Sequence, residues 1–200
     1  MIDEGYIKYR CYWQETPAIA ETDITELNLW RNQLYKLGLI GEYPNGIGFG
    51  NLSIRIPHSS ELIVSGTQTG GIADLSAHHY TKVVDYDWQQ NYVRCQGLIK
   101  ASSETLTHGA IYTADSTVNA VIHVHHQQLW DNLLDAVPTT NPECAYGTPE
   151  MAREIIRLCQ QPSTKNRRII IMSGHESGII TFGSSLTEAG NILLSYFSTI

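Results

Sequence analysis

Residues 118–126 read Val-Asn-Ala-Val-Ile-His-Val-His-His, and the alternation within this run is typical of a strand with one buried face. Ile122 and Val124 point to one face of the strand, while His123 and His125 point to the other. Two imidazoles side by side can meet one metal ion, and imidazole is the usual neutral ligand of zinc and similar metals. The run therefore predicts part of a metal site, with a further ligand elsewhere in the chain.

Size and composition indicate one globular domain. We expect a single domain over residues 1–200, with residues 1–22 as an N-terminal extension. With 16% charged residues, 42% hydrophobic residues and a net charge of -7, the chain resembles neither a disordered polyanion nor a nucleic-acid-binding protein. The start of the chain does not read as a signal peptide, and no apolar run is long enough for a membrane span. We therefore expect a cytoplasmic protein without a nucleic-acid or membrane partner.

The four cysteines are widely scattered and form no Cys-x-x-Cys pair. This spacing favours free thiols over a disulfide framework or a zinc ribbon.

The first half of the sequence predicts a helix followed by strands. Apolar residues recur at helical spacing from Ile24 to Leu37, with Asp23 and Glu26 placed as a capping box and Gly38 as the stop. A glycine-rich turn region then leads to short apolar runs. The predicted strands are 52–56, 62–64, 82–85 and 92–94, which together form an antiparallel meander.

The second half alternates helices with short buried strands. A helix over 106–114 leads into the histidine strand, Thr148-Pro149 begins a second helix, and Ser185 with Glu188 caps a closing helix. Between the last two helices lie predicted strands at 169–172 and 179–182. The chain therefore reads as an α/β sandwich with a mostly antiparallel sheet.

His175 is the best candidate for the missing ligand. It lies in the turn Gly174-His-Glu-Ser-Gly178 between two apolar strands, from which a side chain can reach a neighbouring strand. A plain turn residue is the alternative for His175, and polar residues facing solvent are the alternative for His123 and His125.

Glu104 is the candidate acid or base, because it begins the helix that precedes the histidine strand. The exposed amides there, with the hydroxyls of Ser102 and Ser103, suit an anion. His108 shares the helix face of Glu104 and is expected to make a structural hydrogen bond.

The order of these motifs resembles the class II aldolase and adducin family, which includes metal-dependent aldolases, epimerases and dehydratases of sugar phosphates. Each motif is weak alone, but all occur in order between about Trp30 and about Leu194. They are Gly50-Asn-Leu-Ser53, Ser65-Gly-Thr67, Ser102-Ser-Glu104 with His108 and Tyr112, His123-Val-His125, Tyr146-Gly-Thr148 and Gly174-His175. The resemblance implies a three-layer α/β/α sandwich with a mostly antiparallel central sheet.

The resemblance also implies a metal centre beside a phosphate site. His123, His125 and His175 would bind one divalent ion per chain, Zn²⁺ first, with Mn²⁺, Fe²⁺ or Co²⁺ as alternatives. Glu104 would move the proton while the ion stabilises an enediolate. The implied phosphate-binding residues are Asn51, Ser65, Gly66, Thr67, Ser102 and Ser103. The implied function is a lyase of the aldolase type that cleaves a small phosphorylated ketose or a related hydroxy-carbonyl compound.

Two other functions fit the same motifs. A sugar-phosphate epimerase or dehydratase would use the same metal but would need a second proton donor. An adducin-like interaction module would keep the fold without turnover, although it has no reason to retain three histidines and a glutamate together.

One group expected in the aldolases is missing. No tyrosine lies between Tyr112 and Tyr146, where the sugar-phosphate aldolases carry a residue that helps to protonate the departing aldehyde. The family also implies a homotetramer with sites at subunit boundaries, where a neighbouring chain can supply this group. Tyr9, Tyr12 and Tyr43 are the candidates.

Overall fold

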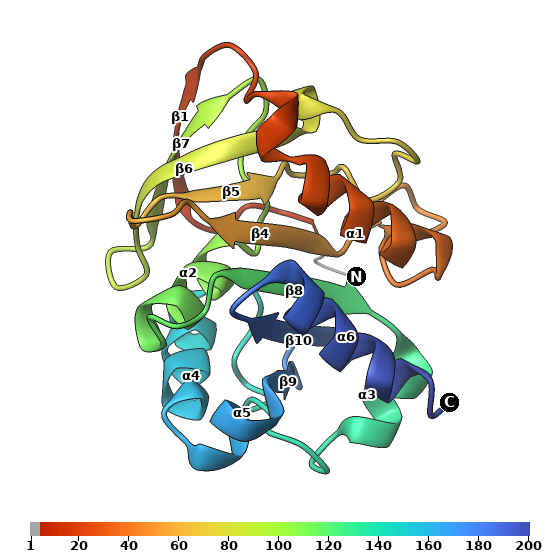
Figure 1. Ribbon diagram of the computed structural model, residues 1–200. Helices are drawn as coiled ribbons and strands as arrows, with labels where there is room; N and C mark the ends of the chain where they lie inside the picture. The colour runs from red at the N-terminus through yellow and green to blue at the C-terminus, as the bar shows by residue number, and fades with distance from the viewer. Residues whose placement is uncertain (1–4) are drawn as a thin grey trace.

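The computed structural model of the protein describes residues 5–200, so the first four residues of the expected N-terminal extension lie outside the described residues. The strands are β1 (Arg10–Glu15), β2 (Gly41–Glu42), β3 (Gly48–Phe49), β4 (Asn51–Arg55), β5 (Leu62–Ser65), β6 (Tyr80–Asp87), β7 (Tyr92–Gly97), β8 (Ala120–His125), β9 (Ile169–Ile171) and β10 (Gly178–Gly183). Eight of them form one sheet of order β1-β7-β6-β5-β4-β8-β10-β9, and β2 pairs with β3. Figure 1 shows this sheet passing through the molecule from β1 to β9.

Neighbouring strands of the large sheet pair antiparallel, except β1 and β7, which are parallel. The predicted meander is confirmed as β4 to β7, and the histidine strand as β8. β8 lies in the interior of the sheet between β4 and β10, which accounts for its buried side chains on both faces.

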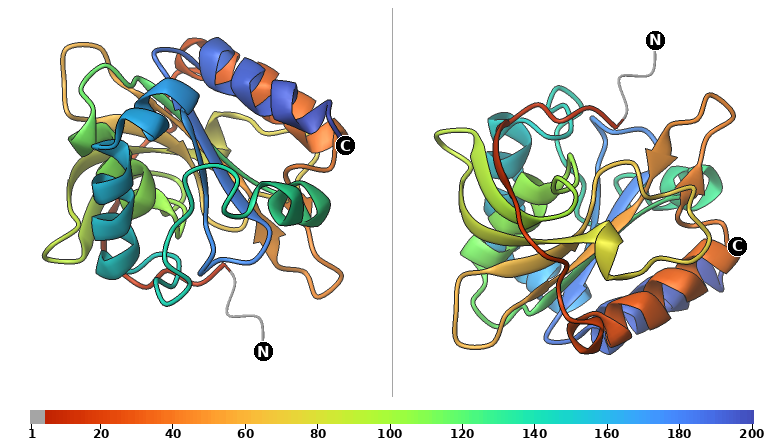
Figure 2. Two further views of the ribbon diagram at one scale, coloured as in Figure 1. Left: turned by 90° about the horizontal axis from the view of Figure 1, so that it is seen from below. Right: turned by 90° about the horizontal axis from the view of Figure 1, so that it is seen from above.

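Helices cover both faces of the sheet. They are α1 (Thr25–Lys36), α2 (Thr105–Ala114), α3 (Gln127–Leu133), α4 (Pro149–Cys159), α5 (Pro162–Arg167) and α6 (Leu186–Phe197), with 3₁₀ turns at Glu21–Asp23 and Ala77–His79. Helices α1 and α6 pack side by side on one face, while α2 and α4 pack together on the other (Figure 2). These layers confirm the predicted three-layer sandwich.

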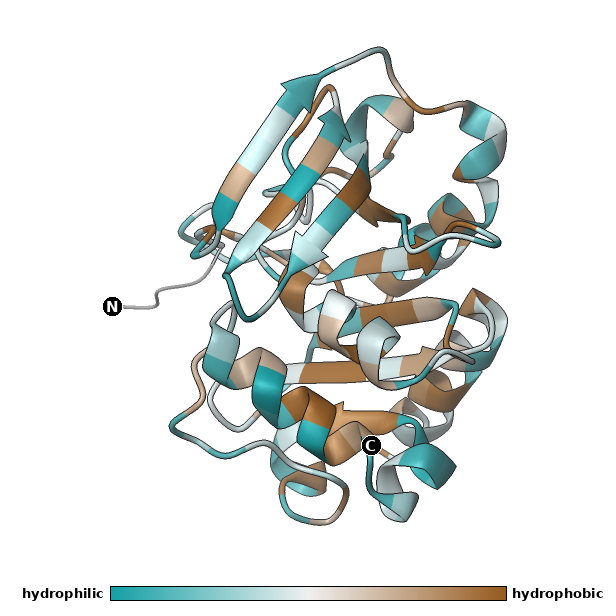
Figure 3. Cartoon of the chain, turned by 90° about the vertical axis from the view of Figure 1, so that its left-hand side faces the viewer, coloured by the Kyte–Doolittle hydropathy of each residue, from teal (hydrophilic) through white to brown (hydrophobic). Residues whose placement is uncertain are grey.

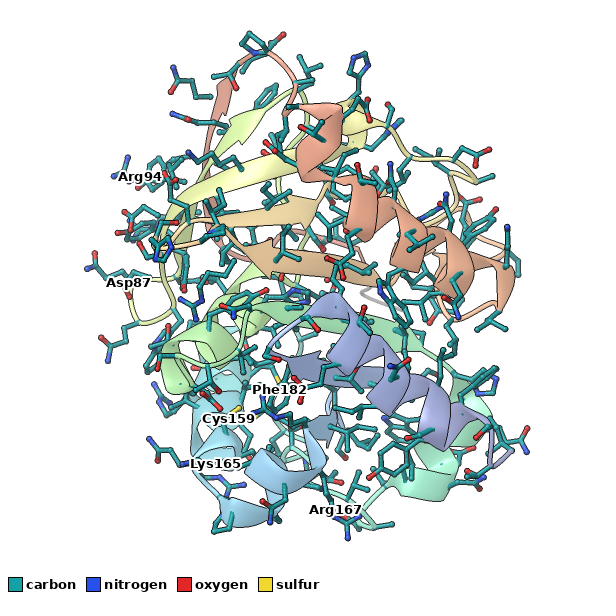
Figure 4. The ribbon with its side chains drawn as sticks, viewed as in Figure 1. Asp87, Arg94, Cys159, Lys165, Arg167 and Phe182 are labelled. Atoms are coloured by element: carbon teal, nitrogen blue, oxygen red, sulfur yellow. The ribbon has the colours of Figure 1, made fainter. Side chains whose placement is uncertain are left out.

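Two hydrophobic clusters fill the space between the layers. Along β8, Ile122 and Val124 belong to the cluster under α1 and α6, whereas Val121 belongs to the cluster under α2 and α4. Figure 3 shows the apolar residues concentrated along the central strands. Figure 4 shows Phe182 and Cys159 between β10 and α4, where both are buried.

The ends of the helices agree with the sequence only in part. The prediction of Asp23 as a cap was wrong: α1 begins after Ile24 without a side-chain hydrogen bond at its N-cap, because Asp23 ends a separate 3₁₀ turn. The stop at Gly38 is confirmed, since this glycine has a φ of 72°, a left-handed conformation that glycine adopts without strain.

The predicted starts of α4 and α6 are confirmed, and each has a side-chain cap. The Thr148 hydroxyl accepts a hydrogen bond of 3.3 Å from the Met151 N–H. The Ser185 hydroxyl accepts one of 3.1 Å from the Glu188 N–H. The Glu188 carboxylate accepts from the N–H of Ser184 rather than of Ser185, so only half of the predicted capping box forms.

The sequence patterns did not predict β1, whose side chains are mostly exposed. It pairs with β7 in register Arg10↔Tyr92. Just before it, the buried Tyr9 hydroxyl lies 3.1 Å from the Ala101 carbonyl oxygen and 2.9 Å from that of Ser102. The N-terminal segment is thereby joined to the loop that carries the Ser-Ser-Glu motif.

Between residues 5 and 200, no helix has both the length and the apolar character that a membrane crossing requires.

Candidate metal centre

Three histidines meet at one end of the strand pair β8 and β10. His123 and His125 lie on the same side of β8, and the antiparallel register sets His125 opposite Gly178. His175 lies in the turn between β9 and β10, and its carbonyl oxygen accepts a hydrogen bond of 2.9 Å from the Gly178 N–H. A Cβ atom at Gly178 would lie 2.8 Å from the His175 carbonyl oxygen and 3.2 Å from its ring, so glycine lets this turn close tightly.

The predicted three ligands are therefore neighbours in space. One potential ligand atom of each histidine lies within 4.8 Å of the others. The exposed fractions are 1% for His123, 3% for His125 and 4% for His175. Three buried imidazoles so close together form a group that could hold a metal ion.

Hydrogen bonds at the Nδ1 atoms orient the imidazole rings of His123 and His125. His123 Nδ1 lies 3.2 Å from the Ile179 carbonyl oxygen, which can only accept a hydrogen bond, so Nδ1 carries the proton and Nε2 presents a lone pair. His125 Nδ1 lies 2.7 Å from the Tyr43 hydroxyl oxygen. Partners of this kind fix the ring orientation of metal-binding histidines.

These histidines suit a metal ion. Burial, and next the neighbouring His175 imidazole, lower the pKa of His123 and of His125 well below the usual value, so both rings are neutral and able to ligate. Their Nε2 atoms lie 3.0 Å apart. Two nitrogens bound to one zinc ion at about 2.0–2.1 Å lie at most about 4 Å apart, so this pair already has a suitable separation.

Glu104 lies beside the histidines, as predicted. It is the N-cap residue of α2 and is 2% exposed. Its Oε1 atom is 3.5 Å from His175 Nδ1. The candidate acid or base is therefore a buried carboxylate next to the three histidines.

A polar pocket adjoins His123 and Glu104. Its lining residues are Gly5, Gly48, Phe49, Gly50, Asn51, Gly66, Thr67, Gln68, Thr69, Gly70, Ser102, Ser103, Glu104 and His123. The buried Asn51 Oδ1 has no hydrogen-bond partner among the residues that the structure describes. A pocket of amides and hydroxyls with such an atom suits a polar ligand.

Most of the predicted phosphate-binding residues line this pocket: Asn51, Gly66, Thr67, Ser102 and Ser103. Ser65 does not belong to the lining. Its hydroxyl oxygen instead accepts a hydrogen bond of 3.2 Å from the Leu52 N–H, inside the sheet.

Sequence reasoning missed the aromatic residues around the histidines. Phe49 lies against His125, with ring centroids 5.5 Å apart. Tyr146 stacks on His175 at 4.6 Å, and Lys8 Nζ lies 3.8 Å from the centre of the Tyr146 ring. The only signals for them were a turn-rich region around β2 and β3 and the motif Tyr146-Gly-Thr148.

His108 has the structural role that was predicted. Its Nδ1 atom lies 2.7 Å from the Ser53 hydroxyl oxygen, which lies 2.8 Å from the Tyr112 hydroxyl oxygen. Burial lowers the pKa of His108 to about 3 and raises that of Tyr112, so both stay neutral at physiological pH. The three residues form a neutral hydrogen-bonded network between β4 and α2.

Comparison with known proteins identifies the class of this fold and site. Residues 45–196 match the model of the class II aldolase and adducin N-terminal domain. The match covers most of the chain, which belongs to the class II aldolase and adducin family. The resemblance read from the motifs is thereby confirmed.

One curated relative is a methylthioribulose-1-phosphate dehydratase from Leptospira interrogans. It is 35% identical over 125 residues, in a match that covers 58% of this chain and 48% of that protein, so the chain spans about half the length of this relative.

Solved structures support the fold. An L-fuculose 1-phosphate aldolase has a TM-score of 0.68 at 19% identity, covering 91% of this chain and 84% of that one. A sugar-phosphate aldolase from Thermotoga maritima has a TM-score of 0.65 at 14% identity, covering 88% and 90%. At these identities the likeness concerns the fold.

Proposed function

We propose that the protein is a metal-dependent lyase acting on a small phosphorylated ketose or a related hydroxy-carbonyl compound, with His123, His125 and His175 as the metal ligands. The observation that carries this proposal is the meeting of three buried imidazoles and a buried carboxylate, of which His123 and Glu104 line a pocket of amides and hydroxyls. Zn²⁺ is our first choice of ion, because three imidazoles leave a position for substrate. A divalent ion there would polarise a substrate carbonyl and stabilise the negative charge that develops beside it.

The chain's own residues supply binding and proton transfer. Asn51, Ser102 and Ser103, with Gly66 and Thr67, would hold the phosphate group through hydroxyls, an amide and backbone N–H groups. Because Glu104 and His123 line the same pocket as these residues, a substrate held by its phosphate group would have its carbonyl end next to Glu104. Positioning of this kind is a main source of catalytic rate.

In aldol cleavage, Glu104 would accept the proton of the substrate hydroxyl while the adjacent carbon–carbon bond breaks. The electron pair of that bond passes to the carbon next to the carbonyl, and Glu104 returns the proton to this carbon. The aldehyde and the ketone then leave without a covalent bond to the enzyme.

Dehydration is the second candidate, and two observations favour it. The relative that is 35% identical is a dehydratase, and the chain has no tyrosine between Tyr112 and Tyr146 to assist a departing aldehyde. Glu104 would remove the proton from the carbon next to the carbonyl and deliver it to the hydroxyl that leaves the following carbon as water. The need for a second proton donor falls away for this reaction, because one carboxyl carries the proton throughout.

We also propose that the chain is a single domain and assembles as a homotetramer with sites at subunit boundaries. The exposed Leu29 on α1 and Leu37 directly after it are consistent with a contact between subunits. Light scattering of the purified protein tests this assembly, and a monomer would contradict it.

The function is tested by incubating metal-loaded protein with a panel of phosphorylated ketoses and analysing the products by mass spectrometry. Cleavage gives two smaller carbonyl compounds, whereas dehydration gives one product lighter by a water molecule. The controls are chelator-treated protein and the Glu104→Gln variant, both of which should be inactive. Turnover that persists without metal would contradict the proposal.

A further inference from the structure

The polar pocket beside His123 and Glu104 is nearly closed. Its volume is about 20 Å³ when counted as the space open to the centre of a water molecule. A space of this size holds about one water molecule. A molecule as large as a phosphorylated ketose can therefore enter only after one wall of the pocket has moved.

Most walls of the pocket are fixed by the fold. Asn51 and His123 are paired across the neighbouring strands β4 and β8. The loop between β5 and β6 is held by the buried Arg31, whose guanidinium donates hydrogen bonds to the carbonyl oxygens of Thr69 at 3.1 Å and Gly70 at 2.9 Å. Moving these walls would break the sheet or the hydrogen bonds of a buried cation, which is costly.

The remaining wall belongs to the N-terminal segment. Gly5 lines the pocket, and residues 5–9 lead from it to β1. A Cβ atom at Gly5 would lie 3.0 Å from the Ile47 side chain, so this end of the segment packs against the loop between β2 and β3. Figure 2 shows the red segment passing beside the blue turn between β9 and β10. We call residues 5–9 the N-terminal strap, and they precede the part of the chain that matches the family domain.

The middle of the strap lies on Tyr146. The Tyr6 N–H donates a hydrogen bond of 3.4 Å to the Tyr146 hydroxyl oxygen, and Lys8 Nζ lies 3.8 Å from the centre of the Tyr146 ring. The same ring stacks on His175, with centroids 4.6 Å apart and an angle of 25° between the planes. Two groups at these distances cannot share one face, so Lys8 and His175 lie on opposite faces. Lys8 thus attaches the strap, by a cation–π contact, to the ring that covers His175.

The other end of the strap is anchored more firmly. Tyr9 is buried, and its hydroxyl lies 3.1 Å from the Ala101 carbonyl oxygen and 2.9 Å from that of Ser102. Next to it, the Lys8 carbonyl oxygen accepts a hydrogen bond of 3.1 Å from Asn91 Nδ2. Opening of the strap would therefore pivot at Tyr9.

We propose that residues 5–9 close the pocket over the metal centre, with Tyr9 as the anchor and Lys8 as the latch, and that this strap opens to admit a ligand. In the closed state a bound molecule is shut off from bulk water, as closing segments do in many enzymes. The inference concerns access to the pocket, so it holds for any reaction at this site.

Access is tested by modifying histidines with diethyl pyrocarbonate, a neutral reagent that acylates unprotonated imidazoles. The full-length protein is treated with and without Zn²⁺, and each histidine is followed by peptide mass spectrometry. His175 should react slowly, at a rate set by local opening of the strap. The exposed His58 reports the activity of the reagent, and the buried His108, which does not line the pocket, reports global unfolding.

The latch and the anchor are tested with four variants. Lys8→Met loses a contact that exists only in the closed state, so the His175 rate should rise about two- to fivefold. Lys8→Arg should restore the wild-type rate, since guanidinium also stacks on aromatic rings. Tyr9→Phe leaves buried carbonyl groups without a donor and should raise the rate by about fivefold or more. The matched control is Arg94→Met, because Arg94 Cζ lies 4.7 Å from the centre of the Tyr12 ring on β1, outside the pocket; the rate should stay unchanged.

Each other outcome has a definite meaning. Wild-type His175 rates in both folded Lys8→Met and Tyr9→Phe would overturn the strap. An equal rise in Arg94→Met would overturn the latch, because any loosening of β1 would then suffice. A rise at His108 that matches the rise at His175 would show global unfolding in place of strap opening. The expected rates in a protein that binds no zinc, or that turns over no phosphorylated ketose, would count against the proposed function alone.

Discussion

Removal of the Tyr43 hydroxyl should weaken metal binding without unfolding the protein. This hydroxyl oxygen lies 2.7 Å from His125 Nδ1 and so holds the ring with Nε2 toward the other histidines. In Tyr43→Phe the ring can keep its place against Phe49, with centroids 4.6 Å apart, while the hydrogen bond is lost. Loss of such an outer partner reduces metal affinity by about 10–100-fold, equivalent to ~1.4–2.7 kcal/mol.

The effect on stability follows from mass action. With free metal at about 100 times the wild-type Kd, binding stabilises the wild type by ~2.7 kcal/mol. The same metal concentration stabilises a variant of tenfold lower affinity by ~1.4 kcal/mol, and one of hundredfold lower affinity by ~0.4 kcal/mol. For a domain of this size, the metal-dependent rise in Tm should therefore be smaller in the variant by about 3–9 °C.

The assay compares Tm with and without Zn²⁺, alongside competition with a coloured chelator. The matched control is Tyr80→Phe, because the Tyr80 hydroxyl donates a hydrogen bond of 2.7 Å to Asn28 Oδ1 away from the metal centre. Its Tm should fall equally with and without metal, since it loses a buried hydrogen bond worth ~1–3 kcal/mol. Zinc affinity of Tyr43→Phe within twofold of wild type would refute the role of this hydroxyl.

Three further results are expected. His123→Ala and His125→Ala should each lose the bound divalent ion in elemental analysis, and full occupancy would remove them from the ligand set. Glu104→Gln should retain the ion but lose exchange of the substrate proton next to the carbonyl, followed by mass spectrometry in D₂O; unchanged exchange would exclude Glu104. Burial lowers the pKa of His108 to about 3, so below about pH 6.5 the unfolded chain binds a proton that the folded chain does not. His108 alone should therefore lower the unfolding free energy in urea by up to ~1.4 kcal/mol per pH unit from about pH 6.5 toward 3, in addition to the contributions of the buried His123 and His125, and His108→Asn should lose this part of the slope; parallel profiles would contradict this.

The features that the sequence predicted well are those with a local pattern. The alternation of side chains identified β8. Ile122 and Val124 face the hydrophobic cluster under α1 and α6, whereas the histidines lie on the opposite face of the strand, the same face as Val121. The starts of α4 and α6 were also found, since Pro149 at the first helical position of α4 and the Ser185 cap of α6 are local signals. The prediction of Asp23 as the cap of α1 failed because Asp23 belongs to a separate 3₁₀ turn before the helix.

Features that depend on distant contacts could not be read in this way. β1 has mostly exposed side chains, and its pairing partner lies far along the chain. Tyr43 is one aromatic residue in a turn-rich segment, and its link to His125 exists only after the sheet has formed. Arg31 did leave a signal, since it interrupts the apolar stripe of Leu27 and Leu34 on the buried side of α1. A charged residue in such a stripe predicts a buried polar partner but does not say which one.

The parallel pairing of β1 with β7 has a consequence for synthesis on the ribosome. Gln14 and Gln96, which hydrogen-bond across these strands, are 82 residues apart. At about 5–20 residues per second, β1 must wait about 4–16 s for its partner to be translated. Until then its backbone donors and acceptors are exposed to other nascent chains, and Tyr9 cannot reach the loop at Ser102. Tyr9 and β1 are thus translated before the loop at Ser102 but take their places only after it has been made.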